Sequence, residues 1–425
     1  MKKLVIAACA VLCGAFVSSA ASIENVIVRQ QWPWSPKVNI DYRLVDADGG
    51  SHDVKLTLKD GDKEIPTVYG SITGDQFGVG QGDHRLVWDP QYGGDQGYAK
   101  QYPNLTATLS IEDDGKQFMV INVSGGSDAE SYPVSFTSTP PSGGWTQGND
   151  YRGSKIVLRR IPAGTFVMGL TQAELDNYKY SREYSRDVFL RRTVTLTKPF
   201  YIGVFAVTKQ QYKYLEGVAV TPAYEAYGAV KSGVTYKMLR GSAAWPALDA
   251  DSALGRLTAK TQASLASVLP NGRFDLPTQA QWERACRAGT TTTFNNGKDF
   301  SVSGGTAYEP NLNGIAIYND GSYFPNVGTA RANAFGLYDM HGLVLEFIRD
   351  KLSNAPGVSN GVTNPQTDPL LRSSLTDYAT AWGCGGRYNG RASECVAGYE
   401  TLVGTASSNY NVSDGAGFRL AFVFD

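Results

Sequence analysis

The chain has 425 residues, a length that suggests two or three domains and allows a substantial core. Its 39 Lys and Arg residues nearly balance its 40 Asp and Glu residues, and the formal net charge of -1 argues against a nucleic-acid partner or an anionic membrane surface. The 47 glycines and 24 tyrosines are typical of a protein with many turns, loops and short strands.

The first residues have the pattern of a secretory signal peptide. Lys2 and Lys3 precede an apolar run over residues 4–17, and small residues at 18–21 offer a cleavage site. The run has about 14 residues, fewer than the ~20 that span a bilayer, and no later segment is apolar enough to form a membrane span. We therefore expect residues 1–21 to be removed and the mature protein to be secreted, periplasmic or exposed at the cell surface.

Residues 22–138 are predicted to form an all-β sandwich of the immunoglobulin or fibronectin kind. Apolar and polar residues alternate in four segments separated by Gly, Asp and Pro, which are residues 37–46, 52–61, 84–89 and 105–115. Trp88 is expected in the core. Residues 139–153 are rich in Pro, Gly, Ser and Thr without periodicity, which predicts a linker.

Residues 154–425 are predicted to form an α+β domain with few short helices and much loop. Strand pairs are expected within 154–169 and 191–208, and helices within 209–218 and 251–269. The clearest helix follows Thr278, a good capping residue. Its spacing predicts one face with Trp282, Ala285 and Cys286, and a polar side with Glu283, Arg284 and Arg287.

Six phrases in this second part resemble the formylglycine-generating enzyme, or sulfatase-modifying factor, family. They are IPAGTFVMG from Ile161, RRTVTLTKPFYIGVFAVT from Arg191, RFDLPTQAQWERACRAGT from Arg273, NAFGLYDMHG from Asn333, GG at Gly385 and GFRLAF from Gly417. The resemblance implies a C-type-lectin-like fold and leaves out the sandwich. It does not fix an activity, because the family includes copper oxidases that convert a sulfatase cysteine to formylglycine with O2, iron enzymes and proteins that only bind.

The copper site implied by the resemblance is incomplete. The positions of the two copper-binding cysteines hold Gly390 and Cys395, whereas Cu(I) in this family sits between two thiolates. Cys384 replaces an Arg of the family on the other side of the GG turn. Three alternatives are open: a Cys384–Cys395 disulfide, two unpaired thiols, or a rewired copper site in which both are catalytic. We do not expect copper.

An iron site of the three-histidine type is excluded by the histidine count. The chain contains His52, His84 and His341, and the first two fall in the predicted sandwich. His341 is predicted to be a hydrogen-bonded structural residue.

Calcium is a possible structural cofactor by resemblance. Relatives read HGNVWEW where this chain reads HGLVLEF, so that a ligand asparagine has become Leu343, which has no side-chain oxygen, while Glu346 is kept. A second calcium site could use Asn311, Asn319 and Asp320. The alternative there is a solvated Asn-Asp-Gly turn.

The sequence is compatible with two functions. The arginines that follow the second cysteine in relatives are Val396 and Glu400 here, while Arg419 is expected in a structural ion pair. Residues 387–415 are rich in Tyr, Asn, Ser and Gly, a composition that suits recognition of a protein, peptide or glycan ligand. We therefore predict an exported binding protein with a degenerate copper site; the alternative is an active formylglycine-generating oxidase that uses Cys395.

Overall fold

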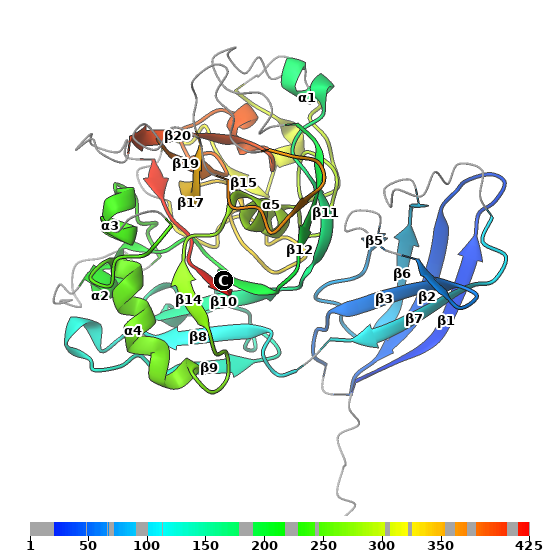
Figure 1. Cartoon of the computed structure of the whole chain (residues 1–425), viewed down its shortest axis with the longest axis horizontal. Coiled ribbons are helices and arrows are strands. Elements are labelled where there is room, and N and C mark those ends of the chain that lie inside the picture. The colour runs from blue at the N-terminus through cyan, green and yellow to red at the C-terminus, as the bar shows by residue number, and fades with distance from the viewer. Residues whose placement is uncertain are drawn as a thin grey trace, which may run out of the picture.

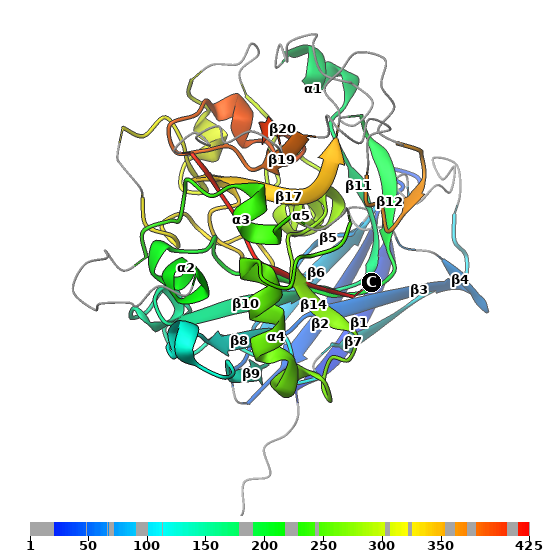
Figure 2. The same ribbon diagram turned by 60° about the vertical axis from the view of Figure 1, so that its left-hand side comes forward.

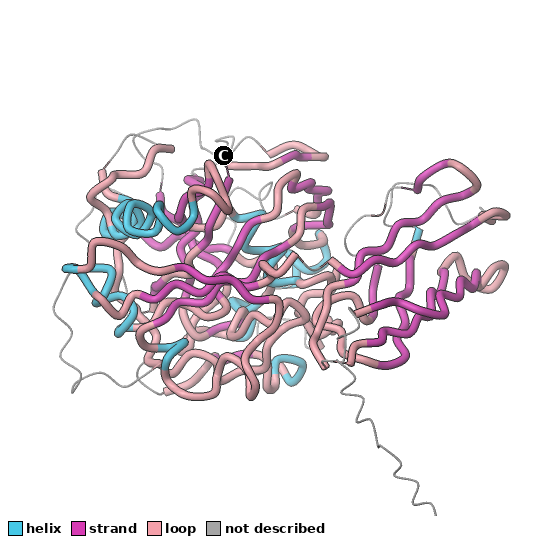
Figure 3. The backbone as a smooth tube through the Cα atoms, turned by 90° about the horizontal axis from the view of Figure 1, so that it is seen from below, coloured by secondary structure: helices cyan, strands magenta, loops and turns pink. Residues whose placement is uncertain are grey.

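The structure is a computed structural model in which the strands gather into two bodies that lie against each other (Figures 1 and 3). It describes residues 21–47, 49–65, 67, 72–90, 101–112, 114–177, 190–216, 228–242, 246–301, 307–321, 325–352, 362–371, 380–405 and 415–424. Residues 1–20 of the predicted signal peptide lie outside this set. None of the helices described is both long and apolar enough to cross a membrane.

The N-terminal body is the predicted sandwich. One sheet has the order β1 (Ser22–Gln30), β2 (Val38–Val45), β6 (Gly82–Trp88) and β5 (Ile72–Gly74); the other has the order β4 (Lys63–Ile65), β3 (Val54–Asp60) and β7 (Leu105–Ile111). Alternate residues of β2 and β3 are buried between the sheets, because side chains of a strand point to opposite faces in turn. Trp88 is 1% exposed in this core, which confirms its predicted place.

The second body is built on a six-stranded antiparallel sheet. Its order is β14 (Gly272–Asp275), β22 (Ala421–Phe424), β13 (Phe200–Gly203), β10 (Lys155–Ile161), β8 (Phe118–Asn122) and β9 (Val134–Thr137). Both faces are covered, so β10 buries Val157 in one core and Ile156 and Leu158 in the other. On the latter face lie α2 (Lys209–Glu216), α3 (Tyr236–Arg240) and α4 (Ala253–Leu265) (Figure 2).

The boundary predicted at residue 138 is wrong. β8 and β9 belong to the sheet of the second body, because β8 pairs with β10 over five residues and buries Met119 and Ile121 completely beside Leu158. The sandwich therefore ends with β7 at Ile111. An alternating pattern identifies a strand, but it does not tell which sheet the strand joins.

The predicted linker is also packed into the second body. Trp145 is 3% exposed, and its ring lies 5.0 Å from that of Phe118 and 4.7 Å from that of Tyr151, between ring centroids. These aromatic contacts fix a segment whose Pro- and Gly-rich composition indicated a flexible connection.

Smaller sheets and short helices complete the second body. One sheet contains β11 (Gly164–Met168), β12 (Arg192–Leu196) and β18 (Gln366–Thr367), and a second pairs β15 (Ala316–Ile317) with β16 (His341–Gly342). A third contains β17 (Leu345–Leu352), β19 (Thr380–Cys384), β20 (Glu400–Thr405) and β21 (Ala416–Gly417). The helices are α1 (Gln172–Asn177) and α5 (Gln279–Arg287), with single turns of 3-10 helix at Gly126–Asp128, Asp150–Arg152, Pro310–Leu312 and Ala392–Cys395. The strand pairs expected within 154–169 and 191–208 pair across these segments instead, β10 with β13 and β11 with β12.

Helix α5 begins as predicted, but its polar side is not in solvent. Thr278 and Gln281 form a capping box, and Trp282 is fully buried. Arg284 is 1% exposed because its guanidinium donates to the carbonyls of Ala163 and Gly164 at 3.1 and 2.7 Å. The charged side of α5 thus holds the turn between β10 and β11. Glu283 and Arg287 are buried with it as an ion pair of 2.7 Å.

The two bodies meet through a buried contact. Arg159 of β10 pairs with Asp53 at the start of β3, and these residues are 3% and 5% exposed. Nearby, the rings of Phe77 and Phe335 lie 4.5 Å apart between centroids. The buried ion pair and the neighbouring aromatic contact fix the position of the sandwich against the second body.

Candidate functional site

The region that corresponds to the family's site lies where β16, β17 and β19 meet the turn after Cys384. The N–H groups of Gly342 and Tyr388 donate to the carbonyls of Gly385 and Leu343, which stitches the HGLVLEF stretch to the GG turn. Leu343 has a φ of +63° and is fully buried. The backbone turn of the family's phrase is present, with an apolar side chain filling its interior.

Gly390 supplies no thiol at the first of the two positions. A Cβ added there would lie 2.4 Å from Glu394 Oε2, the end of a flexible side chain that stands 3.7 Å from Arg387 Nε. Cys395 is fully buried, and its Sγ lies 3.7 Å from the Arg391 carbonyl. Burial raises the pKa of the Cys395 thiol, so it is protonated at neutral pH.

Cys286, Cys384 and Cys395 are free thiols in this structure. Cys384 and Cys395 are therefore unpaired in this structure and do not form the disulfide that was one of the three alternatives. Burial, with Glu400 adding to it, raises the pKa of the Cys384 thiol well above its usual value. Cys286 is fully buried on α5 and also keeps its proton because burial raises its pKa.

This set of donors does not fit Cu(I), which needs two closely placed thiolates. One of the two positions is Gly390, which has no side-chain donor, so that only Cys395 remains of the pair. Among the residues that the structure describes, no group of three His, Cys, Asp or Glu side chains is arranged to hold a metal ion.

His341 is a structural residue, in agreement with the prediction. Its Nε2 accepts from the Asn295 N–H at 3.2 Å, and its Nδ1 donates to the Cys395 carbonyl at 2.7 Å. Burial lowers the pKa of His341 to about 4, so the ring is neutral and carries its proton on Nδ1. The imidazole therefore ties β16 to the turn that carries Cys395.

Glu346, which was predicted as a calcium ligand, has its carboxylate hydrogen-bonded to two other side chains. Its two oxygens accept from Arg419 at 2.8 to 3.1 Å and from Trp282 Nε1 at 2.6 Å, all fully or almost fully buried. Arg419 also donates to the carbonyls of Gly203, Val204 and Tyr338. Because the guanidinium and the indole satisfy the carboxylate, Glu346 is a structural anchor. The ion pair predicted for Arg419 is confirmed.

The other predicted calcium residues are held by two different turns. The Asn311 side chain donates to the Asp299 carbonyl at 2.8 Å. The N–H groups of Asn319 and Asp320 donate to the carbonyls of Gly390 and Tyr388 at 3.0 and 2.8 Å. Asn319 and Asp320 therefore lie beside Gly390, which we call the altered copper position. Calcium binding by these residues stays a prediction.

Sequence reasoning missed a buried acid beside Cys384. Glu400 of β20 stands opposite Cys384 of β19 in the ladder and is 2% exposed. Neither carboxyl oxygen has a hydrogen-bond partner among the described residues, and burial raises the pKa of Glu400 well above its usual value. The sequence signalled only a lost arginine here, since a charged residue in a short strand is usually taken to face solvent.

Comparison with known proteins identifies the domain. The model of the sulfatase-modifying factor enzyme 1-like domain matches residues 149–423. Among solved structures, the chain is similar to Treponema denticola variable protein 1, with 18% identity, a TM-score of 0.42, and coverage of 64% of this chain and 96% of that one. It is also similar to CarF, with 17% identity, a TM-score of 0.34, and coverage of 62% and 99%.

No curated protein matches the chain significantly. The family match is therefore the firm assignment, since it spans most of the chain and contains every residue of the site described above. With its matching domain at residues 149–423, the chain belongs to the sulfatase-modifying factor enzyme 1-like family.

Proposed function

We propose that this chain is an exported binding protein of its family and not a copper oxidase. The observation that carries the proposal is Gly390, which stands at the position of the family's first copper-binding cysteine and has no thiol. The burial of Cys395 supports it further, because a thiol whose pKa is raised by burial is a poor nucleophile at neutral pH. The N-terminal signal pattern supports export.

The binding surface that we propose surrounds the altered copper position. Asn319, Asn389 and Arg391 are exposed there, with Arg387 and Tyr399 half-buried beside them. The hydrogen bonds from Asn319 and Asp320 to the 388–390 turn hold two separate loops as one surface. Small polar side chains beside aromatic and guanidinium groups suit a protein, peptide or glycan ligand, because they offer hydrogen bonds and flat contact area at little entropic cost.

The oxidase is tested with a sulfatase-motif peptide that contains the target cysteine. The protein is incubated with this peptide, Cu(I), reductant and O2, and the peptide is analysed by mass spectrometry. We expect the cysteine to be unchanged. Conversion to formylglycine would make the chain an active oxidase and overturn the proposal.

A matched variant tests whether Glu394 fills the copper position. Gly390→Cys alone would bring the new side chain against Glu394, whereas Gly390→Cys with Glu394→Ala removes that contact. We expect the double variant to bind Cu(I) more tightly than wild type does, as measured by competition with a chromophoric chelator. Equal affinities of all three proteins would contradict this account of the site.

Binding itself is tested by screening the mature protein on glycan and peptide arrays. A genuine ligand should lose roughly tenfold or more in affinity on Asn319→Ala with Arg391→Ala, as expected for contacts at an interface centre. Glu64→Ala, on exposed β4 of the sandwich, is the control and should leave binding unchanged. Binding that is weakened by the control substitution and not by the double variant would place the recognition surface elsewhere.

A further inference from the structure

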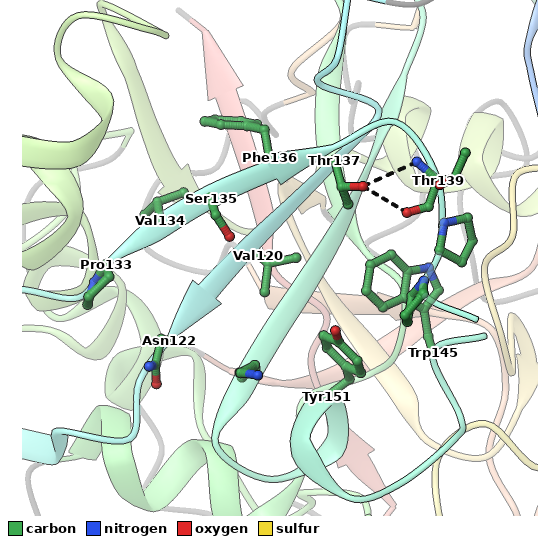
Figure 4. Close-up of a pocket in the computed structure, with 13 residues that line it drawn as sticks. Val120, Asn122, Pro133, Val134, Ser135, Phe136, Thr137, Thr139, Trp145 and Tyr151 are labelled. Atoms are coloured by element: carbon green, nitrogen blue, oxygen red, sulfur yellow. Dashed lines mark hydrogen bonds between the residues drawn. The ribbon is translucent and has the colours of Figure 1, made fainter. Parts of the chain in front are cut away.

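A second groove lies on the six-stranded sheet, beside its edge strand β9. It has a volume of about 560 Å³ and is floored by Val120 and Asn122 of β8 and Ser135 of β9 (Figure 4). Trp145 and Tyr151 form its opposite wall, from the segment that the sequence predicted to be a linker. None of these residues belongs to the site around Gly390.

The register of the sheet shows which backbone groups of β9 are available. The N–H of Asn122 donates to the Pro133 carbonyl, so 122 and 133 form a hydrogen-bonded pair. Such pairs alternate in an antiparallel ladder, which makes Ser135 and Thr137 the next residues of β9 bonded to β8. The N–H and C=O groups of Val134 and Phe136 therefore point away from β8.

Within the described part of the chain, these outward groups are unpaired. β9 is the last strand in the sheet order, and no hydrogen bond within the described part of the chain reaches the outward groups of Val134 and Phe136. Figures 1 and 2 both place β9 at the lower margin of the second body. The strand reads Val-Ser-Phe-Thr, so it carries none of the charges that commonly protect an edge strand from pairing.

The side chains of β9 divide between the core and the groove. Val134 and Phe136 pack against the core on the α4 side. Ser135 and Thr137 face the other way, toward the groove, and Ser135 is exposed (Figure 4). A strand added at this edge would direct alternate side chains to the groove side of the sheet, because successive side chains of a strand alternate between its faces.

The groove wall favours an uncharged ligand. The Lys155 ammonium is paired with Asp150 at 2.9 Å and lies over the Tyr151 ring, so it presents no unbalanced charge. An aromatic wall beside an open strand edge matches a peptide that offers apolar side chains to the wall and backbone groups to the edge.

We infer that β9 is a docking edge for an extended, uncharged peptide segment of a partner protein. The peptide adds as a seventh strand through the backbone groups of Val134 and Phe136, and places alternate apolar side chains in the groove against Trp145 and Tyr151. This site is independent of the surface around Gly390 and goes beyond the function proposed for it.

The experiment selects random heptapeptides displayed on phage against the full mature protein. Parallel selections use Ser135→Trp, which fills the groove from an exposed position, and Ser135→Ala, which leaves it open. We expect enriched peptides to alternate apolar and small residues, and to bind Ser135→Trp at least roughly tenfold more weakly than wild type or Ser135→Ala. N-methylation of alternate peptide amides should abolish binding in one register only.

Three results would overturn the inference. One is the absence of any peptide enriched on wild type over Ser135→Trp. Another is binding that survives N-methylation in both registers, which would mean that the strand edge is not used. The third is a stable dimer in light scattering that Ser135→Trp dissociates, which would show that a second copy of this chain occupies the edge. Matching thermal unfolding of the two variants establishes that both are folded.

Discussion

The buried carboxylate of Glu346 is held by one cation, and that dependence can be measured. Arg419→Leu removes the guanidinium and leaves Glu346 charged and buried with only the Trp282 N–H. We expect the variant to lose about 3–5 kcal/mol in the free energy of unfolding, the usual cost of breaking one side of a buried ion pair. Urea denaturation followed by tryptophan fluorescence measures it.

The matched control replaces both partners. Glu346→Gln with Arg419→Met leaves no buried charge, so its loss should be well below that of Arg419→Leu alone. Calcium is added in a separate titration. If calcium stabilised the wild type and not the Glu346→Gln variant, Glu346 would be a calcium ligand after all.

Glu400 should make stability depend on pH. Burial raises its pKa in the folded state above the ordinary value of 4.5, so the folded protein holds this proton more tightly than the unfolded chain does. The stabilising contribution is then full below pH 4.5 and is lost as the pH rises toward the folded pKa. Glu400→Gln keeps the shape of the protonated acid and cannot ionise.

We therefore expect the stability advantage of Glu400→Gln over wild type to grow between pH 4.5 and neutral pH. Unfolding free energies at a series of pH values measure the difference between the two proteins. A difference that stays constant with pH would show that Glu400 titrates as an ordinary exposed acid.

At the scale of elements, α5 is the clearest test of local sequence signals. Thr278→Ala removes the side-chain acceptor for the Gln281 N–H, a contact in the buried capping box. The expected loss is about 1 kcal/mol in the free energy of unfolding. Gln262→Ala, at an exposed position of α4, is the control and should change stability by less than about 0.5 kcal/mol. Equal losses would mean that the cap contributes nothing specific.

The same helix shows where sequence patterns fail. The capping residue and the burial of Trp282 follow from local chemistry, and both were predictable. The burial of Arg284 was not, because its partners are the Ala163 and Gly164 carbonyls, more than a hundred residues away along the chain. A charged residue on a helix is assigned to solvent unless its distant partner is known.

Only some features of the candidate site could be predicted from the sequence. The loss of a thiol at Gly390 is visible in the sequence once the family phrase is aligned, and the structure adds that the Glu394 carboxylate lies against this glycine. The pairing of Glu346 with Arg419 could be anticipated only from one side, as an ion pair of unknown partner. The buried Glu400 beside Cys384 needed the register of β19 and β20.

For the whole molecule, the sheet order predicts which fragment can fold. The family match begins at residue 149, but β8 and β9 precede it and complete the six-stranded sheet. A fragment of residues 149–425 would expose the β8-facing edge of β10 and the apolar cores on both sides. We expect it to aggregate, and a fragment of residues 114–425 to be monomeric with a cooperative thermal transition.

Size-exclusion chromatography and circular dichroism of the two fragments distinguish these outcomes. Their comparison controls for loss of the sandwich, since both fragments lack it and differ only in residues 114–148. Cooperative unfolding of the shorter fragment would mean that β8 and β9 are an accessory to the sheet and not part of its fold.

The position of β8 and β9 also constrains how such a protein can be assembled in evolution. The residues that close the six-stranded sheet are encoded upstream of the segment matched by the family model, next to the sandwich. A recombination event at the Pro- and Gly-rich segment 139–153 would separate the sheet from two of its strands. The breakpoint that could exchange the N-terminal module intact lies between Ile111 and Phe118, in the short stretch that joins β7 to β8.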